Sequence, residues 1–596
     1  MLDMNPRILL SIGGSLLMAN LLCAQAPEDE KLASFYKNYL EENFHLQPLH
    51  ATSLGDHRFD AQLDDISPEA RQRWSELARH TLETLPRQVD YQKLSRDGQV
   101  DFETLASELT AHLWQESNLR PFERDARVYG HYLSDAVYLP LAKSTLPKEE
   151  NIAHVIARMA EFPRIIEEAK RSLTHPVKPI LETAIRQNLG AIAFYEKDLF
   201  NYTGETPQQP QLKAAADRVA AELKEYQKYL EGPMRERAED NWRLGKDKFD
   251  RKFELETGVG VTAEENLADA EAQFALVHDQ LYVVSRQLWS KYFPQRPLPP
   301  DDGAGRRDTI TRVVDALSKA NALPSPSEGG VKDLVAKVQA RVENIKAFIR
   351  AKNYLRLPEP DRCAIIEMPE FRRGNALAYM DNAPPLDPQA GSYYAVSPPP
   401  SNWTPQQVRS FFEEYNEYML QVLTIHEAYP GHYVQLEYGN RQPSLIRRAL
   451  GSGAYIEGWA VYGEITMLNE GYGEGDLCLR LMQLKFYLRA IANSILDYKM
   501  HCTQMTDDEA LKFLTEEAFQ SEGEARLKIV RSKQSAVQLS TYFIGRMAHY
   551  RLRQAIEREQ GEKFELARYH EAVLAVGAVQ PKYLPELVRR RLGMAH

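Results

Sequence analysis

Residues 212–231 read LKAAADRVAAELKEYQKYLE. Their apolar side chains recur every three to four positions, and most of the other residues are strong helix formers such as Ala, Glu and Lys. This combination predicts an amphipathic helix. The same pattern occurs in residues 150–173, 263–290, 331–352, 404–429, 477–505, 507–519 and 546–559. The sequence therefore predicts a mainly α-helical protein.

One region interrupts the helical pattern with short apolar runs that are typical of β-strands. The runs are 364–368, 376–380 and 392–396, and each is bounded by Pro, Gly or polar residues. They fall just before residues 424–433, which carry two histidines. We therefore expect a small β-sheet beside the helix of those histidines, with an edge that could hold an extended peptide by strand addition.

The length of 596 residues is more than one hydrophobic core requires, so we expect two packed lobes. Residues 292–308 are the richest in Gly and Pro, which places a boundary near residue 305. The predicted N-terminal helical lobe is then 27–305, and the second lobe is 306–596. A net charge of −11 and the lack of a basic stripe argue against nucleic-acid binding.

The first 26 residues have the composition of a signal peptide. Arg7 precedes an apolar run over 8–22, and small residues follow it. The run is short for a membrane span and lacks a basic stop, so we expect export to the periplasm or the extracellular space, and no transmembrane helix in the mature chain. Lipid anchoring through Cys23 is the alternative, although Leu22 is bulky for a lipoprotein signal.

Residues 424–433 read TIHEAYPGHY and contain a variant of a zinc-binding pattern. In the common pattern His-Glu-x-x-His, the two histidines lie about 40° apart around a helix and face one ion. His426 and His432 are six residues apart, which on a regular helix is about 120°. Pro430 lacks an N–H and Gly431 tolerates unusual backbone angles, so we predict a two-residue bulge that returns His432 to the face of His426.

A catalytic zinc ion needs three protein ligands and one open position. Glu457 is the predicted third ligand, because the 25 residues after His432 allow a loop and an antiparallel second helix. Glu464 follows seven residues later on the same helical face, where it can orient a ligand imidazole. Glu427 is left free as general base. The sequence thus predicts one Zn²⁺ per chain, held by His426, His432 and Glu457.

At these residues the sequence resembles a bacterial family known as domain of unknown function 885. Its members carry His-Glu-x-x-Pro-Gly-His and then Glu-Gly-Trp-Ala-x-Tyr-x-Glu, which match residues 426–432 and 457–464. The family resembles a divergent, gluzincin-like branch of the mostly helical zinc peptidases. The resemblance implies a two-lobed zinc-peptidase-like architecture, a deep cleft between helical lobes and peptide substrates.

Further positions match the family outside the two motifs. Asp497 and His501 fit a segment in which an Asp and a His lie four apart on one helix, and Asp497 is expected to be a supporting carboxylate near the site. Ala536 departs from the family, since many relatives have Pro there. The other matching positions are Arg531, Gln538, Tyr542, Gly545 and His570.

Peptide hydrolysis needs a hydrogen-bond donor for the oxyanion, and often a cation for a terminal carboxylate. Tyr542 is the predicted donor, with His501 and His570 as the next candidates. Arg531 either binds a substrate carboxylate or pairs with a helix glutamate. His570 and Tyr433 are further candidates for contact with substrate in the cleft.

Three functions fit these residues. The first is a zinc peptidase acting on short peptides as a carboxypeptidase or dipeptidase. The second is a non-haem iron oxygenase, because two histidines and one carboxylate also form its facial triad. The third is a catalytically silent peptide-binding protein of the same fold. Glu427 beside His426 favours the first, since neither alternative needs a general base there. The sequence leaves the oligomeric state open.

Overall fold

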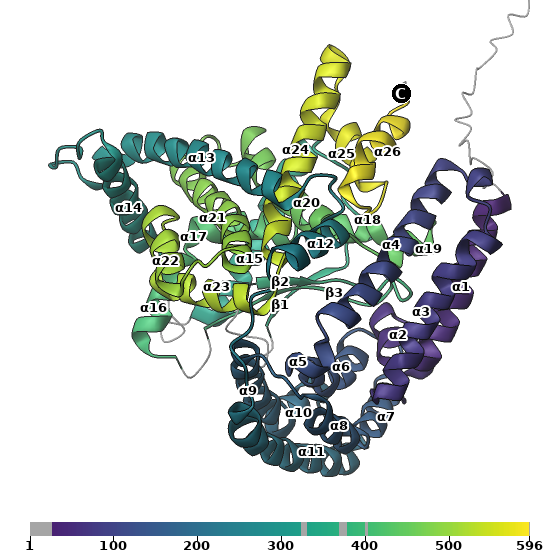
Figure 1. The fold of residues 1–596 in the computed structure, drawn as a ribbon. Coiled ribbons are helices and arrows are strands. Elements are labelled where there is room, and N and C mark those ends of the chain that lie inside the picture. Colours follow the sequence, from purple (N-terminus) through teal and green to yellow (C-terminus); the bar gives the residue numbers. More distant parts are fainter. Residues whose placement is uncertain (1–26, 324–329, 369–377, 400–402, 595–596) are drawn as a thin grey trace, which may run out of the picture.

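The computed structural model consists mainly of helices, as the periodicity predicts, with one small sheet (Figure 1). It describes residues 27–594 apart from 324–329, 369–377 and 400–402. The predicted signal peptide, with Cys23, lies outside the described residues. None of the described helices is both long enough and apolar enough to cross a bilayer.

The N-terminal helices bury apolar side chains in two cores. One core extends from Leu32 to Leu109 and also includes Ile446, and the other extends from Leu63 to Met234. These helices lie together on one side of the molecule (purple to dark blue in Figure 1). They are α1 (Pro27–Leu46), α2 (Pro48–Leu54), α3 (Pro68–Gln88), α4 (Arg96–Asn118), α5 (Pro121–Arg124), α6 (Arg127–Ala142), α7 (Lys148–Met159), α8 (Phe162–Ser172), α9 (Lys178–Ala193), α10 (Leu199–Thr203) and α11 (Gln209–Tyr229).

Most of the later helices share the largest core, which runs from Ala270 to Leu592 and also includes Val100, whereas Phe249, Phe253 and Ile446 belong to smaller cores. In this core α13 packs against α14 and α21, so helices on both sides of residue 305 are joined; the predicted boundary there stays a prediction. The helices are α12 (Lys246–Thr257), α13 (Ala263–Tyr292), α14 (Gly303–Ala320), α15 (Gly330–Ala351), α16 (Pro405–Glu414), α17 (Glu417–Glu427), α18 (His432–Asn440), α19 (Leu445–Ala449), α20 (Gly453–Asn469), α21 (Leu477–Cys502), α22 (Asp507–Lys512), α23 (Glu522–Gln534), α24 (Thr541–Gln560), α25 (Leu566–Leu574) and α26 (Leu584–Arg591).

Three strands form the sheet, in the regions where the sequence predicts them. They are β1 (Cys363–Glu367), β2 (Ala378–Asp381) and β3 (Ser392–Val396), in the order β1-β3-β2. β3 pairs in parallel with β1 and antiparallel with β2. The Tyr394 hydroxyl of β3 lies 3.2 Å from the Thr424 hydroxyl in α17, which fixes the sheet beside the helix that carries His426.

Polar residues set the starts of the helices around this sheet. The predicted helical stretch 404–429 is divided, because the Asn416 side chain accepts hydrogen bonds from Tyr418 N and Met419 N and so caps the N-terminus of α17. The Ser452 hydroxyl caps α20 in the same way through Tyr455 N. These caps fix where the two helices that carry the candidate site begin.

Helices α20 and α24 approach each other closely where two glycines meet. A Cβ on Gly458 would overlap the backbone of Gly545, and a Cβ on Gly545 would overlap the carbonyl oxygen of Ala454. Glu457 precedes one glycine, and Tyr542 lies one helical turn before the other. The crossing therefore brings the turn of α20 that carries Glu457 next to the start of α24.

Substituting Gly545→Ala should lower the free energy of unfolding by about 1–3 kcal/mol, because the added methyl must separate two packed helices. Gly190→Ala is the matched control, since Gly190 lies within α9 and a Cβ there meets no atom within 4 Å. The control should leave stability unchanged or raise it by about 0.5–1 kcal/mol. Urea and thermal unfolding of both variants measure this, and equal stability of Gly545→Ala and wild type would contradict the close crossing.

Candidate metal centre

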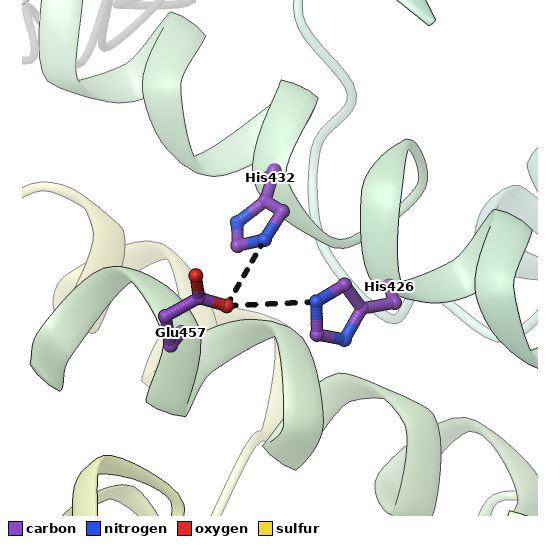
Figure 2. A group of neighbouring side chains, drawn as sticks. All are labelled: His426, His432 and Glu457. Carbon is purple, nitrogen blue, oxygen red and sulfur yellow. Dashed lines mark ion pairs between the residues drawn. The ribbon is translucent and has the colours of Figure 1, made fainter. Parts of the chain in front are cut away.

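Three side chains from three helices converge on one point (Figure 2). His426 lies in the last turn of α17, His432 begins α18, and Glu457 lies in the first turns of α20. Glu457 Oε2 is 3.6 Å from His426 Nε2 and 3.4 Å from His432 Nε2. All three ligand atoms lie within 4.8 Å of one another.

These atoms fit a tetrahedral divalent ion. With bonds of 2.0–2.1 Å, such an ion separates its ligand atoms by roughly 3.3–3.4 Å, close to the two distances from the carboxylate. Glu457 Oε2 is buried and, although it lies near both imidazoles, it accepts no hydrogen bond among the described residues, so an ion between the three side chains would satisfy it. Two imidazoles and one carboxylate are also a donor set that zinc prefers. The residues present therefore fit a zinc ion.

The histidine pair is aligned by a break in the chain, not by the predicted bulge. α17 ends at Glu427 and α18 begins at His432, with non-helical residues between them. Two features explain the break: Pro430 has no N–H to continue the helix, and the Cα of Gly431 lies so close to His426 O that a Cβ would overlap it. The indole N–H of Trp459 donates to Pro430 O at 2.8 Å and ties this break to α20.

Glu464 lies behind the first histidine. Its Oε1 is 2.6 Å from His426 Nδ1, and its side chain is completely buried two turns after Glu457. A hydrogen bond at Nδ1 leaves Nε2 as the metal-facing nitrogen and fixes the orientation of the ring. The spacing predicts this arrangement, and the described geometry has it.

Burial and the imidazoles act in opposite directions on the carboxylates of the site. Burial alone would raise the pKa of Glu457, but His426 and His432 lower it below its usual value. Burial raises the pKa of Glu427, although the two imidazoles and a hydrogen bond from the Met380 backbone in β2 oppose the increase. Glu427 is thus a buried carboxyl group that lies beside the three converging side chains but is not one of them.

A second group of polar side chains lies next to Glu457. The Tyr542 hydroxyl accepts hydrogen bonds from Arg531 Nη2 at 3.1 Å and from Gln538 Nε2 at 3.3 Å. Burial and the carboxylate of Glu457 raise the pKa of Tyr542, which keeps its proton in place. Because the phenol oxygen already accepts two hydrogen bonds, its own O–H is left to donate to a further group.

Asp497 acts on the turn before α24. It is buried and accepts hydrogen bonds from Val537 N at 3.0 Å, Ser540 N at 3.1 Å and Ser540 Oγ at 2.8 Å. Val537 has a φ of 74°, a left-handed conformation that costs a β-branched residue about 1–3 kcal/mol. Asp497 therefore stabilises the strained turn that precedes Tyr542. The sequence predicts only that Asp497 is a supporting carboxylate near the site.

Three other predicted site residues have their polar atoms engaged elsewhere. His501 lies 3.2 Å from Leu244 N through Nδ1 and 2.8 Å from Ser532 O through Nε2. His570 bonds the Tyr462 hydroxyl through Nε2 and Tyr354 O through Nδ1. The Tyr433 hydroxyl accepts from Arg362 N at 2.7 Å. All three side chains are buried in the described structure, and their contact with substrate stays a prediction.

One aromatic residue beside the three converging side chains has no signal in the sequence. Phe486 of α21 contacts His426 edge to face, with ring centroids 6.0 Å apart. α21 contains many apolar residues, and the sequence alone does not show which of them contacts a histidine.

Sequence comparison places the chain in a known family. The family described as "Bacterial protein of unknown function (DUF885)" matches residues 48–588. The chain belongs to this family. The match confirms the relationship expected from the two motifs. A search of curated proteins finds no match.

Two solved structures share the fold over almost their whole length. One is a "putative lipoprotein of unknown function" from Shewanella oneidensis, with 28% identity and a TM-score of 0.76, covering 93% of this chain and 99% of that one. The other is a "putative lipoprotein" from Colwellia psychrerythraea, with 18% identity and a TM-score of 0.77, covering 95% and 100%. At 18% identity the second shows the fold alone.

The role of Glu464 can be tested through metal affinity. Glu464→Gln should lower zinc affinity about 10–100-fold, because a neutral amide orients and polarises the His426 ring less well than a carboxylate. Competition with a chromogenic chelator measures the change. Glu470→Gln, at the end of the same helix and paired with Arg553, is the control and should bind zinc like the wild type. Equal affinity in both variants would mean that Glu464 does not support the metal.

Proposed function

We propose that this protein is a zinc peptidase that hydrolyses peptide bonds in short peptides. The observation that supports it most strongly is the convergence of His426, His432 and an unsatisfied Glu457 oxygen, with the buried carboxyl group of Glu427 directly beside them. A metal ion that only binds a ligand or stabilises the fold needs no free carboxylate at this position. Catalysis of hydrolysis does, because water must lose a proton as it attacks.

Glu427 is the general base of the proposed reaction. When bound, zinc supplies Lewis-acid polarisation of a carbonyl and acidification of a water molecule. Glu427 accepts the proton from the attacking water and returns it to the leaving nitrogen. Burial raises the pKa of Glu427. The raised pKa makes its carboxylate a stronger base toward water, while the protonated carboxyl group can still donate to the leaving nitrogen.

Tyr542 is the proposed donor to the oxyanion. Arg531 and Gln538 both donate to its oxygen, so its own proton is available for an oxygen that gains charge in the transition state. His426, His432 and Glu457 lie on α17, α18 and α20, and Tyr542 approaches from α24. The two kinds of group thus come from different helices, as is required of groups that act on a carbonyl from two sides.

The edge of the sheet supports a place for the peptide backbone. In the described part of the sheet β2 is an outer strand that pairs with β3, and the backbone of Met380 bonds Glu427. An extended peptide added along β2 would therefore pass the general base. We propose that the N-terminal helices and the later helices form the two lobes that flank such a peptide.

We also propose that the mature protein is exported. Residues 1–26 have the composition of a signal peptide, and both similar solved structures are described as "putative lipoprotein". Attachment through a lipid on Cys23 is the variant of this proposal that the relatives favour.

Glu427→Gln should retain one zinc per chain and lose at least about 100-fold in kcat, because glutamine cannot accept the proton from water. Mass spectrometry of a digested peptide mixture and metal analysis of the same sample measure both. Glu417→Gln at the other end of α17 is the control and should keep full activity. Unchanged turnover in Glu427→Gln would contradict the mechanism. Oxygen consumption by an iron-loaded protein, or peptide binding without cleavage by the wild type, would favour the alternatives.

Tyr542→Phe should reduce kcat about 100-fold with little change in KM, since the lost donor acts mainly in the transition state. Tyr550→Phe in the same helix is the control, because its hydroxyl bonds Gln554 and should not affect the rate. Steady-state kinetics on one short peptide compare the two. A loss confined to KM would show that Tyr542 binds substrate and does not stabilise the oxyanion.

A further inference from the structure

We infer that Arg531 binds a carboxylate of the peptide substrate, so that cleavage takes place next to that carboxylate. The inference rests on the proposed function and extends it by naming the substrate class: peptides with a free C-terminal carboxylate or an acidic side chain near the bond that is cut. The two sources share one chemistry, an anionic carboxylate that a planar guanidinium can bind through two parallel hydrogen bonds.

Arg531 is held beside the metal centre by neutral groups. Its Nη2 donates to Gln538 Oε1 at 2.7 Å and to Tyr542 Oη at 3.1 Å. Gly458 and Gly545 meet where α20 crosses α24, which places the start of α24, with Tyr542, beside the turn of α20 that carries Glu457. The guanidinium therefore lies near the three converging side chains. Both contacts use the same nitrogen, so Nε and Nη1 are available for another partner.

The charge of Arg531 has no acidic partner within 4.0 Å among the described residues. The neighbouring carboxylate of Glu524, on the same helix, is shared by two other cations: Arg489 Nη2 at 2.5 Å and Lys528 Nζ at 3.8 Å. Arg526, one helical turn and a half before Arg531, has Glu522 as its partner at 2.7 Å. Near the metal centre the α23 wall thus has more cations than carboxylates.

Burial sharpens this imbalance around Arg531. Lys528 is almost completely buried, and burial together with Arg489 lowers its pKa well below the usual value. Glu524 already pairs with Arg489, so Arg531 is left without a carboxylate at ion-pair distance among the described residues. Arg531 is also exposed, whereas Lys528 is not, so a ligand can reach it. An exposed, fixed guanidinium beside a metal centre is suited to an anion that arrives with the substrate.

The surrounding structure fixes this arginine in place. Gln538 and Tyr542 follow the turn that Asp497 stabilises through Val537 N and Ser540 N. The positions of Gln538 and Tyr542 are therefore set by a buried hydrogen-bond network, and Arg531 is oriented by both. Arg531 donates a hydrogen bond to Tyr542, the proposed oxyanion donor. A substrate carboxylate bound to Arg531 therefore places a nearby carbonyl at Tyr542.

Binding can be measured without turnover in the zinc-loaded Glu427→Gln protein. Three ligands are compared by calorimetry: trialanine with a free C-terminus, trialanine amide, and Ala-Ala-Glu amide. We expect at least one of the two carboxylate-bearing peptides to bind about tenfold or more tightly than trialanine amide, since a charge-assisted hydrogen bond is lost in the amide. A preference for free trialanine assigns the C-terminal carboxylate, and a preference for Ala-Ala-Glu amide assigns the acidic side chain.

Arg531→Gln should abolish this preference while zinc content stays the same, and Arg531→Lys should restore part of it. Arg526→Gln is the matched control on the same helix and should keep the preference. Equal affinity of all three peptides for the starting protein, or a preference that survives in Arg531→Gln, would overturn this inference and leave the peptidase proposal standing. Binding of none of the peptides, together with no cleavage by the wild type, would overturn both.

Discussion

The close crossing of α20 and α24 at Gly458 and Gly545 is the contact on which the candidate site depends. Glu457, a proposed metal ligand, and Tyr542, the proposed oxyanion donor, are about 85 residues apart in the chain, and this crossing brings their helices together. Any side chain larger than hydrogen at either glycine would force the two backbones apart. Arg531 lies in α23 and Gln538 in the turn between α23 and α24. Their positions relative to Glu457 therefore depend on the same contact.

The balance of charge inside the site gives a second argument for a cation. Glu427, Glu457 and Glu464 place three carboxyl groups around two imidazoles, and burial raises the pKa of Glu427 and of Glu464. Buried carboxylates are costly unless they are paired, and here three buried carboxyl groups share two imidazoles. A divalent cation would favour the charged forms of these carboxyl groups. The number of carboxyl groups therefore supports a metal centre independently of the distances between the ligand atoms.

Much of the fold and the three converging side chains could be predicted from the sequence, because both depend on local spacing. Helical periodicity and the short runs before residue 400 identified the helices and the strands, and the spacing of His426, His432 and Glu457 identified the cluster. The break at Pro430 could not be distinguished from a bulge, since the choice depends on Gly431 packing against His426 O. The hydrogen bonds of His501 to Ser532 O and of His570 to Tyr354 O could not be predicted, because contacts with the backbone of distant segments leave no trace in sequence spacing.

The N-terminal helices contribute to the site although no metal ligand lies in them. Arg127, at the start of α6, donates through Nη2 to Gln534 O at 2.9 Å, and the Gln534 side chain donates to Pro179 O of α9 at 3.1 Å. Gln534 is the last residue of α23, directly before the turn that Asp497 of α21 stabilises. The turn is thus held from both sides, which explains how a strained Val537 persists there. Because Arg531 and Tyr542 lie at the two ends of this held segment, the N-terminal helices help to fix the distance between the proposed carboxylate site and the metal centre.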